Sequence, residues 1–373
     1  MSKGGIKLVI FLSLFFLFNF LLSPKVSAAY RFSQFKAHPP IHIFGSAQKI
    51  PGGLSPQEIK NIYHLPNDGG RGTIAIIGAY DDANIEKDLN IFSKQFGLPE
   101  CTTKNGCFEK HNLGATKSDS GWSLETSLDV EWSHAIAPQA KILLVEAKTP
   151  SGQNLLDAID YAVKQKDVVA ISMSWGGAEF SDEVNLDSHF IGNNKVSFFA
   201  SSGDDGTGPS WPAASPNVVA VGGTTLLFNK DMTAKKENAW SGSGGGISAY
   251  ETQPDFQKNY SISKSKGYRA IPDVAYNADP ASGFSVYKTT GKDKNNWYVL
   301  GGTSAGAPQW AAIHSLGLSA YNKNFYADKA SGNNVNYFND IISGKNGDCG
   351  YLCSARKHYD YVTGLGSPLT VNF

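Results

Sequence analysis

The segment GGTSAGAPQWAAIH, residues 301–314, could present a serine nucleophile. Ser304 stands between small residues that would let a peptide approach its hydroxyl, and a helical pattern begins directly after it. The N-terminus of a helix offers unpaired N–H groups and the positive end of a dipole to a developing anion. Because a serine hydroxyl is a weak nucleophile until a base takes its proton, a base must lie elsewhere in the chain.

Two carboxylates are the best candidates for that base. Glu125 and Asp129, in GWSLETSLDVEWSHAIAP, are four residues apart, so a helix would place them on one face and one turn from each other. Two close carboxyl groups resist ionising together and can share a proton, and such a pair can act as a base in acid. Taken alone, this spacing is more often a solvated helix face.

Histidine is a weaker candidate. A Ser-His-Asp enzyme needs a histidine with an orienting carboxylate, and the chain has eight histidines. His134 follows in the same helical segment, and His314 lies ten residues beyond Ser304, about 15 Å away along a helix. We expect surface or packing roles for them. A histidine-dependent hydrolase, working near neutral pH, is the third alternative.

Alternating strands and helices would position these residues. Short apolar runs that predict strands buried on both faces begin at Thr73, Ala140, Val168, Val196 and Asn217. Helical patterns lie between them, in ANIEKDLNIFSKQFG, WSLETSLDVEWSHAIA and QNLLDAIDYAVKQKD. The alternation predicts a parallel sheet with right-handed crossovers. Gly and Ser cluster after the strands, in SWGG, SSGDDG and SGSGGG, where ligands of such sheets bind.

Composition indicates an exported globular chain. Of 373 residues, 41% are hydrophobic, and 33 basic residues balance 33 acidic ones, so neither nucleic acid nor an anionic surface is implied as a partner. Residues 1–28 have a basic start, an apolar run, a proline and small residues, which predicts a cleaved secretory signal. A retained membrane anchor is the alternative, because the run could cross most of a bilayer. No later stretch is apolar enough to span a membrane, so we expect the remainder to be soluble and secreted.

The four cysteines form two local pairs, Cys101 with Cys107 and Cys349 with Cys353. Outside the cytosol such pairs usually oxidise, although four cysteines permit three connectivities. A zinc site is the alternative, but the spacings are wrong and no histidine stands beside either pair at ligand spacing. Two disulfides are expected.

Several motifs occur in a fixed order: GWSLETSLDVEWSHAIAP, SMSWGG, ASSGDDG, AASPNVVAVGGTTL, AWSGSGGGISAYE and GGTSAGAPQWAA. Together they resemble the sedolisin family of serine-carboxyl peptidases, secreted relatives of subtilisin. The resemblance runs from about Gly53 to the C-terminus and implies a subtilisin-like α/β fold, with a mostly parallel central sheet, helices on both faces and a C-terminal calcium loop. It also implies an acid-active endopeptidase that works through an acyl-enzyme. The expected division is a signal at residues 1–28, a short segment at 29–52 and a peptidase domain at 53–373.

The resemblance assigns roles to four side chains. Ser304 matches the nucleophile, Glu125 the general base and Asp129 the carboxylate behind it. Asp204, in SSGDDG, matches an aspartate that helps to form the oxyanion hole. A protonated acid suits that position, because a neutral carboxyl can donate a hydrogen bond to an oxyanion whereas a carboxylate would repel it. Asp205 is the ordinary alternative, a turn residue.

The resemblance also suggests how a substrate binds. Ser174, Trp175 and Gly176 match a strand end along which an extended peptide is held by main-chain hydrogen bonds, and residues 241–246 could form the facing wall. Core packing is an equal alternative for Trp175. Polypeptides are therefore the expected partners, with no nucleic acid and no stable membrane association after signal cleavage, and we expect a monomer.

The C-terminal segment NDIISGKNGDCGYLCSARKHYDYVTGLGSP resembles the calcium loop of the family. Asp340 and Asp360 match its carboxylate ligands, and Ile341, Arg356 and His358 match carbonyl ligands of one calcium ion. The family usually has glycine at the last two positions, and glycine can be needed there for its dihedral freedom.

Two other features depart from the family pattern and limit what the resemblance implies about activity. Family members are generally made with a long N-terminal prosegment, whereas residues 29–52 are too few for such a domain. Gly78 stands where several relatives carry an acidic residue that extends the carboxylate network, and Asp81 or Asp82 are candidates to compensate. An inactive secreted binding protein on the same scaffold is therefore the second hypothesis.

Overall fold

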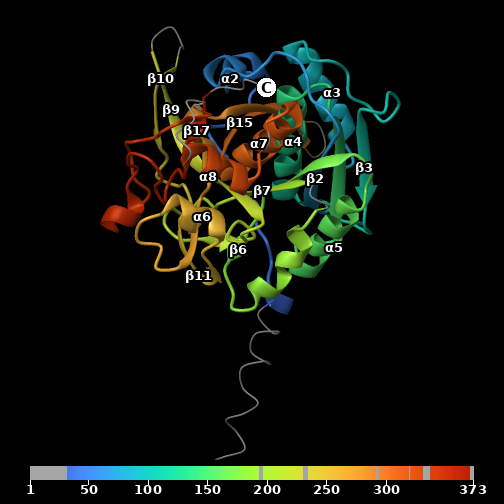
Figure 1. Ribbon diagram of the computed structural model, residues 1–373. Helices are drawn as coiled ribbons and strands as arrows, with labels where there is room; N and C mark the ends of the chain where they lie inside the picture. The colour runs from blue at the N-terminus through green and yellow to red at the C-terminus, as the bar shows by residue number, and fades with distance from the viewer. Residues whose placement is uncertain are drawn as a thin grey trace, which may run out of the picture.

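An eight-stranded sheet forms the centre of the protein, here a computed structural model that describes residues 32–192, 196–229, 234–290, 294–318, 320–330 and 337–369 (Figure 1). Its strands run in the order β10-β9-β7-β5-β2-β4-β3, with β13 beside β9, and only β10 is antiparallel to its neighbour. The bounds are β2 Thr73–Ala79, β3 Phe108–Asn112, β4 Lys141–Ala147, β5 Val168–Met173, β7 Ser197–Ser201, β9 Val218–Phe228, β10 Ala234–Ala239 and β13 Val274–Asn277. The five strands expected from the sequence are thereby confirmed. The predicted signal lies outside the described residues.

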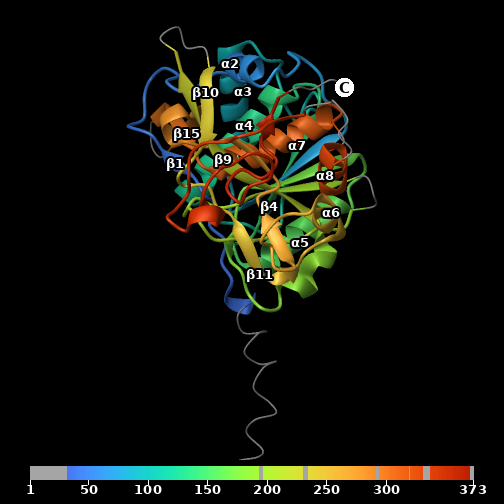
Figure 2. The ribbon, with the colours of Figure 1, turned by 60° about the vertical axis from the view of Figure 1, so that its left-hand side comes forward.

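The two faces of this sheet pack against different helices. In β2, Ile74 and Ile76 join the core beneath α3, α4 and α7, whereas Ala75 and Ile77 join a second core beneath α5. The split follows from the strand itself, because successive side chains point to opposite faces. The helices are α3 Ile85–Phe96, α4 Ser120–Ile136, α5 Gly152–Val163 and α7 Gly306–Leu316. Figures 1 and 2 show α4 and α7 near the middle of the molecule and α5 toward its lower end.

Helix α4 has a clear start signal. Asp119 precedes it in extended conformation, and its carboxylate accepts hydrogen bonds from the N–H groups of Gly121 and Trp122. Such an N-cap satisfies donors that the helix itself leaves unpaired. The cap fixes where α4 begins and therefore which turns carry Glu125 and Asp129.

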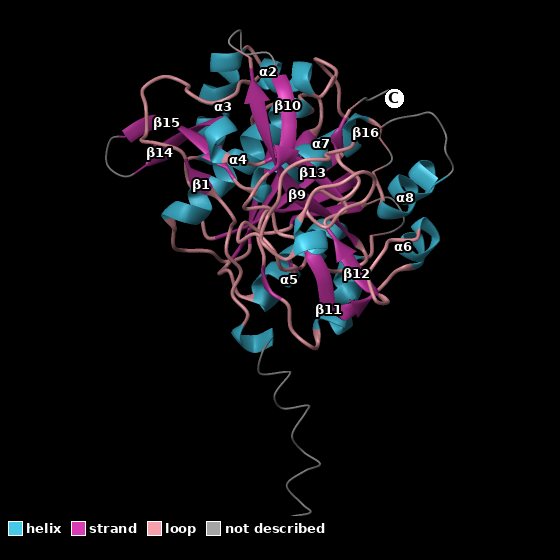
Figure 3. Cartoon of the chain, turned by 90° about the vertical axis from the view of Figure 1, so that its left-hand side faces the viewer, coloured by secondary structure: helices cyan, strands magenta, loops and turns pink. Residues whose placement is uncertain are grey.

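Smaller elements surround the central sheet, and Figure 3 shows β14–β15 at the upper left of the molecule and β11–β12 toward its lower end. β15 lies between β1 and β14, while β11 pairs with β12, β6 with β8 and β16 with β17. The strands are β1 His42–Ile43, β6 Gly177–Ala178, β8 Ser210–Trp211, β11 Gly246–Thr252, β12 Tyr268–Ile271, β14 Phe284–Thr290, β15 Lys294–Gly301, β16 Phe338–Asn339 and β17 Ser367–Pro368. The remaining helices are α2 Pro56–Ile62, α6 Asp255–Tyr260, α8 Asn322–Ala330, and the short 3-10 helices η1 Glu183–Phe190, η2 Pro280–Ser282, η3 Thr303–Ala305 and η4 Gly350–Cys353.

Both expected disulfides are present, Cys101–Cys107 and Cys349–Cys353. The fold corrects the expectation that no histidine stands beside either pair. It brings His134 of α4 next to Cys101 and Cys107, and one ligand atom from each of the three residues lies within 4.8 Å of the other two. The sequence does not show this neighbour, since 27 residues separate His134 from Cys107. The two sulfur atoms are bonded to each other, so the pair is a disulfide with a histidine beside it.

In the part of the chain that the structure describes, no helix combines the length and the apolar character needed to cross a membrane.

Candidate active site

The expected nucleophile and carboxylates meet between α4 and α7. Ser304 lies in η3, between β15 and α7, and is fully buried, while Glu125 and Asp129 on α4 are each 2% exposed. Ser174 follows the carboxyl end of β5; its hydroxyl donates to Asp129 Oδ1 at 2.7 Å and lies 3.1 Å from the Ser304 carbonyl oxygen. The helix, the strand end and the turn therefore place the four side chains in one cluster.

The two carboxyl groups on α4 hold protons more tightly than ordinary carboxyls. Burial raises the pKa of Glu125 well above its usual value, the adjacent Asp129 charge raises it further, and the Ser304 hydroxyl lowers it. Burial likewise raises the pKa of Asp129, while the hydrogen bond from Ser174 and the nearby Glu125 carboxyl lower it. Among the described residues, neither Glu125 oxygen nor the Ser304 hydroxyl makes a hydrogen bond of ordinary geometry. The two carboxyl groups are thus buried together with the Ser304 hydroxyl.

Asp204 lies after the end of β7 and beside η3, which carries Ser304. Its Oδ1 accepts hydrogen bonds from the backbone N–H and the hydroxyl of Thr303, each at 2.8 Å. Its Oδ2 lies 3.1 Å from Nε2 of His42. Burial raises the pKa of Asp204, whereas His42 and Thr303 lower it. Thr303 lies within the GGTSAGAPQWAA motif, whereas no motif marks His42, and only the fold shows that both contact Asp204.

The backbone at Gly302 makes this close approach possible. Gly302 has φ +126°, and a Cβ there would lie 2.1 Å from the carbonyl oxygen of Pro40 and 2.6 Å from Asp204 Oδ2. Only glycine fits a site with this dihedral and these neighbours. The absence of a side chain at Gly302 therefore leaves room for the backbone of Pro40 and for Asp204 beside the Ser304 turn.

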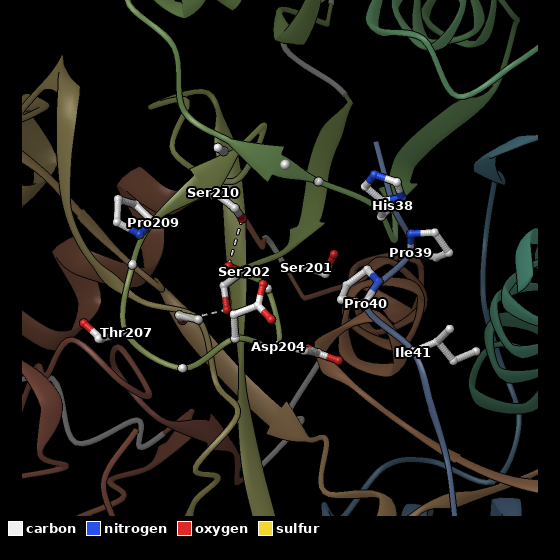
Figure 4. Close-up of a pocket in the computed structure, with 18 of the residues that line it drawn as sticks. His38, Pro39, Pro40, Ile41, Ser201, Ser202, Asp204, Thr207, Pro209 and Ser210 are labelled. Carbon is white, nitrogen blue, oxygen red and sulfur yellow. Dashed lines mark hydrogen bonds between the residues drawn. The ribbon is translucent and has the colours of Figure 1, made fainter. Parts of the chain in front are cut away.

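A cavity of about 560 Å³ opens beside Asp204, as Figure 4 shows. Its walls come from residues 38–42, 176–178 and 201–210, together with Gly244. Gly244 donates its N–H to the Gly203 carbonyl at 2.7 Å, which places part of the segment 241–246 against this loop. Gly176 thus lines the cavity, whereas the Trp175 indole is fully buried and donates to the Ile77 carbonyl at 3.0 Å. Of the two readings of Trp175, its side chain supports core packing.

The histidines near these elements have structural partners. His134 is buried, with Nε2 2.9 Å from the Pro99 carbonyl oxygen, and burial lowers its pKa. His314, near the end of α7, accepts a hydrogen bond from Ala320 N at Nδ1, and burial lowers its pKa to about 4. Both therefore occupy packing positions, as the sequence predicts.

Asp81 and Asp82 do not compensate for Gly78. Lys110 Nζ lies 2.7 Å from Asp81 Oδ1, and Lys288 Nζ lies 2.5 Å from Asp82 Oδ2. Both carboxylates are thus engaged by lysines. Among the described residues, the carboxyl groups that act on Glu125 beside Ser304 are those of Asp129 and Asp204.

The predicted calcium loop is closed by its own hydrogen bonds. Asp360 accepts four of them, from the N–H groups of Arg356, Val362 and Thr363 and from the Thr363 hydroxyl, at 2.8 to 3.1 Å. A carboxylate has about four acceptor positions, so none is left for a cation. Burial raises the pKa of Asp360 to about 6. A cation at Asp360 would therefore have to displace one of these hydrogen bonds.

The other predicted ligands lie around the same loop. Asp340 accepts a hydrogen bond from His358 N at 2.8 Å, and Ile341 is buried. His358 has φ +69°, whereas Arg356 has no positive φ. Of the two positions where glycine was expected, only 358 thus needs left-handed backbone.

Comparison with known proteins places this geometry in a family. The profile of the subtilase family matches residues 113–337, and the chain belongs to that family. Within it, the chain resembles the sedolisins, as its motifs predict. It is 27% identical to sedolisin of Pseudomonas sp. (strain 101) over 366 residues, covering 84% of this chain and 60% of that protein. It is 29% identical to kumamolisin of Bacillus sp. (strain MN-32) over 374 residues, covering 87% of this chain and 64% of that protein.

A solved structure agrees with these matches. Pseudomonas sedolisin, described as a serine-carboxyl proteinase complexed with two molecules of pseudo-iodotyrostatin, superposes with a TM-score of 0.70 and 27% identity over 87% of this chain and 96% of that one. The subtilisin-like fold is therefore confirmed. Tripeptidyl-peptidase 1 of Dictyostelium discoideum is 28% identical over 75% of this chain and 50% of its own length. The chain thus spans between half and two thirds of the length of these curated relatives.

Proposed function

We propose that the chain is a secreted, acid-active serine peptidase that uses Ser304, Glu125 and Asp129. The observation that carries the proposal is the buried cluster of Ser304 with the two carboxyl groups of α4, because no histidine among the described residues takes the place of a base there. The two disulfides are consistent with export. Calcium binding stays a prediction from the resemblance, and no step below depends on it.

The reaction needs the carboxyl pair to hold one proton. With that proton on Asp129, Glu125 takes the proton of Ser304 while Oγ attacks the carbonyl carbon of the scissile peptide bond. Asp204, protonated on Oδ2, donates a hydrogen bond to the oxyanion. The C–N bond then breaks as Glu125 returns its proton to the leaving amine, which leaves an acyl-enzyme on Ser304. A water molecule then attacks the acyl-enzyme while Glu125 again takes and returns a proton, and the carboxylic acid product leaves Ser304.

Hydrolysis of an unfolded protein from pH 2.5 to 8 tests the proposal. Ser304→Ala should abolish turnover, and Glu125→Gln should reduce it by about two to four orders of magnitude, the usual worth of a positioned base. Circular dichroism confirms that each variant is folded. A folded Ser304→Ala variant that still digests the protein would refute the serine mechanism, and a folded parent chain without activity at any pH would favour the binding-protein hypothesis.

The cleavage mode is a second question, because the relatives include tripeptidyl-peptidases. We propose an endopeptidase. An enzyme that removes residues from a free amino terminus cannot use an N-terminally acetylated peptide, whereas an endopeptidase can. Internal cleavage of an acetylated peptide, read by mass spectrometry, supports the proposal, and cleavage only of the unacetylated form contradicts it.

A further inference from the structure

Two glycine-rich segments, residues 203–208 and 241–246, meet at the cavity beside Asp204 (Figure 4). Gly208 and Gly245 exchange two hydrogen bonds across them, at 2.7 and 3.1 Å. We call these two segments the glycine wall. Glycine-rich backbone has more conformational freedom than other backbone, so the position of this wall depends on what packs behind it.

A loop near the C-terminus, residues 344–355, lies against the glycine wall. Its Asn346 is 5% exposed, and Asn346 Nδ2 donates to the Ser243 carbonyl at 2.7 Å. The Asn346 carbonyl accepts a hydrogen bond from Thr207 N–H at 3.2 Å. The fit is close, because a Cβ at Gly206 would lie 2.5 Å from the same carbonyl oxygen. Asn346 therefore contacts both segments of the wall, one through its side chain and the other through its main chain.

A disulfide holds Asn346 in this loop. Asn346 N–H donates to the Cys353 carbonyl at 3.1 Å, and Cys349 Sγ lies 3.9 Å from Thr207 Oγ1. A Cβ at Gly347 would lie 3.1 Å from Cys353 Sγ and 3.4 Å from Thr207 Cγ2, so the sulfur, the loop and the wall are packed together. The Cys349–Cys353 bond closes the loop covalently and limits the conformations that it can adopt. The disulfide thus holds Asn346 and also contacts the wall at Thr207.

Asp204 has separate anchors. The N–H and the hydroxyl of Thr303 each donate to Asp204 Oδ1 at 2.8 Å, and neither bond involves Asn346. A change at Asn346 should therefore move the glycine wall more than it moves the Asp204 carboxyl. The expected consequence is a weaker hold on a bound polypeptide, with little effect on the step that breaks the peptide bond.

We propose that the disulfide loop, residues 344–355, supports the glycine wall as part of a polypeptide-binding site, and that Asn346 is the positioning residue of this support. Asn346 acts through Ser243 and Thr207 and does not itself touch the polypeptide. The inference rests on the proposed peptidase function, which assigns the cavity to a polypeptide. Without the Nδ2 donor, the Ser243 carbonyl loses its hydrogen-bond partner among the described residues, so the wall should shift to satisfy it.

Binding of an unfolded protein to the Ser304→Ala chain tests the support without any need for turnover. The probe is fluorescein-labelled, reduced and carboxymethylated α-lactalbumin, and Kd is read from fluorescence anisotropy with calcium added throughout. Asn346→Ala should raise Kd about tenfold, because it leaves a buried carbonyl of the wall unpaired. The matched control is Asn322→Ala, which should leave Kd unchanged. Asn322 is also buried and donates from Nδ2 at 2.7 Å, to the Val218 carbonyl, but it lines a separate pocket.

Two more variants separate positioning from general damage to the fold. Asn346→Asp should bind as the parent does at pH 3.5 and about tenfold more weakly at pH 7, because a protonated carboxyl can donate to the Ser243 carbonyl and a carboxylate cannot. Asn346→Ala should stay weak at both pH values, since it has no donor in either case. Cys349→Ser combined with Cys353→Ser, which opens the loop, should raise Kd as well. Circular dichroism confirms that each variant is folded.

Kinetics then separate this inference from the peptidase function. With Ser304 restored, Asn346→Ala should raise KM about tenfold and change kcat by less than about twofold, whereas loss of folded protein would lower kcat at constant KM. Weakened binding without hydrolysis by any chain supports the support loop and refutes the peptidase. Hydrolysis with an unchanged KM in Asn346→Ala supports the peptidase and refutes the support loop.

Three binding results would also overturn the proposal. They are a Ser304→Ala chain that does not bind the unfolded protein, equal Kd values for Asn346→Ala and Asn322→Ala, and an Asn346→Asp variant that binds no better at pH 3.5 than Asn346→Ala does.

Discussion

Glu251→Gln should stabilise the protein at neutral pH and not in acid. Glu251, near the end of β11, is 3% exposed, and its Oε1 has no hydrogen-bond partner among the described residues. Burial and the charges of Asp187 and Glu179 raise its pKa to about 8, against an ordinary value of 4.5, while Arg269 opposes the shift. Glutamine has the shape of protonated glutamic acid. The variant therefore keeps the neutral side chain that the fold prefers and cannot adopt the charged carboxylate that burial disfavours.

The size of the effect follows from the two pKa values. Because the folded pKa lies above the unfolded one, the contribution of Glu251 to stability is complete below pH 4.5 and is lost as the pH rises toward 8. Each pH unit in that interval lowers the free energy of unfolding by at most about 1.4 kcal/mol. The loss caused by ionising Glu251 at pH 7 is therefore at most about 3 kcal/mol. Partial hydration of the carboxyl reduces this to about 1 to 2 kcal/mol. A gain of a few degrees in Tm is expected at pH 7.

Thermal unfolding of the Ser304→Ala chain, which cannot digest itself, measures this at pH 4 and pH 7. Glu109→Gln is the matched control, because Glu109 is an exposed glutamate on β3 and should give no pH-dependent change. The reasoning is refuted if Glu251→Gln changes Tm equally at both pH values, or if it lowers Tm at pH 7 while raising it at pH 4.

Three further variants or treatments test other contacts. Ser174→Ala removes the hydrogen bond that lowers the Asp129 pKa, so kcat should fall up to about tenfold and the acid limb of its pH profile should move to higher pH; an unmoved limb contradicts the contact. His358→Gly should raise stability by about 1 kcal/mol in urea unfolding, because a non-glycine residue at φ +69° is strained, whereas Arg356→Gly should give no gain. Calcium added to chelated protein should raise Tm, by mass action, and Asp340→Asn should abolish that rise; equal Tm with and without calcium refutes the site.

The sequence predicts the central strands and helices because these elements follow from patterns among residues close together in the chain. The apolar runs at Thr73 and Val168 become buried strands, and the spacing of Glu125 and Asp129 puts both on one face of α4. These features depend on periods of two and about 3.6 residues, which a single sequence displays. The proposed nucleophile Ser304 is equally visible in the sequence, because its small neighbours and the helix after it are contiguous.

Long-range contacts are the part that the sequence could not show. His42 is 162 residues from Asp204, and His134 reaches the disulfide of Cys101 only because α4 folds back over that loop. Nothing in the composition of residues 32–48 marks them as neighbours of Gly176 and Asp204. The one local signal is His38-Pro39-Pro40, since residues before and at proline favour extended backbone, and extended segments add readily to strand edges. That signal indicates the conformation of the segment but not which part of the fold it contacts.

The pKa shifts of the buried ionisable groups indicate that the fold is most stable in acid and that its stability falls again at still lower pH. Burial raises the pKa of ten carboxyl groups, and each of them favours the fold in acid: Asp82, Glu125, Asp129, Glu131, Glu146, Glu183, Asp187, Asp204, Glu251 and Asp360. The buried His314 acts in the opposite sense. Its pKa falls to about 4 from 6.5, so the unfolded chain binds its proton first and stability declines as the pH falls through that interval. Carboxyls outnumber such histidines, so stability should peak in acid and decline at lower pH, where the buried His134 and His314 must be charged.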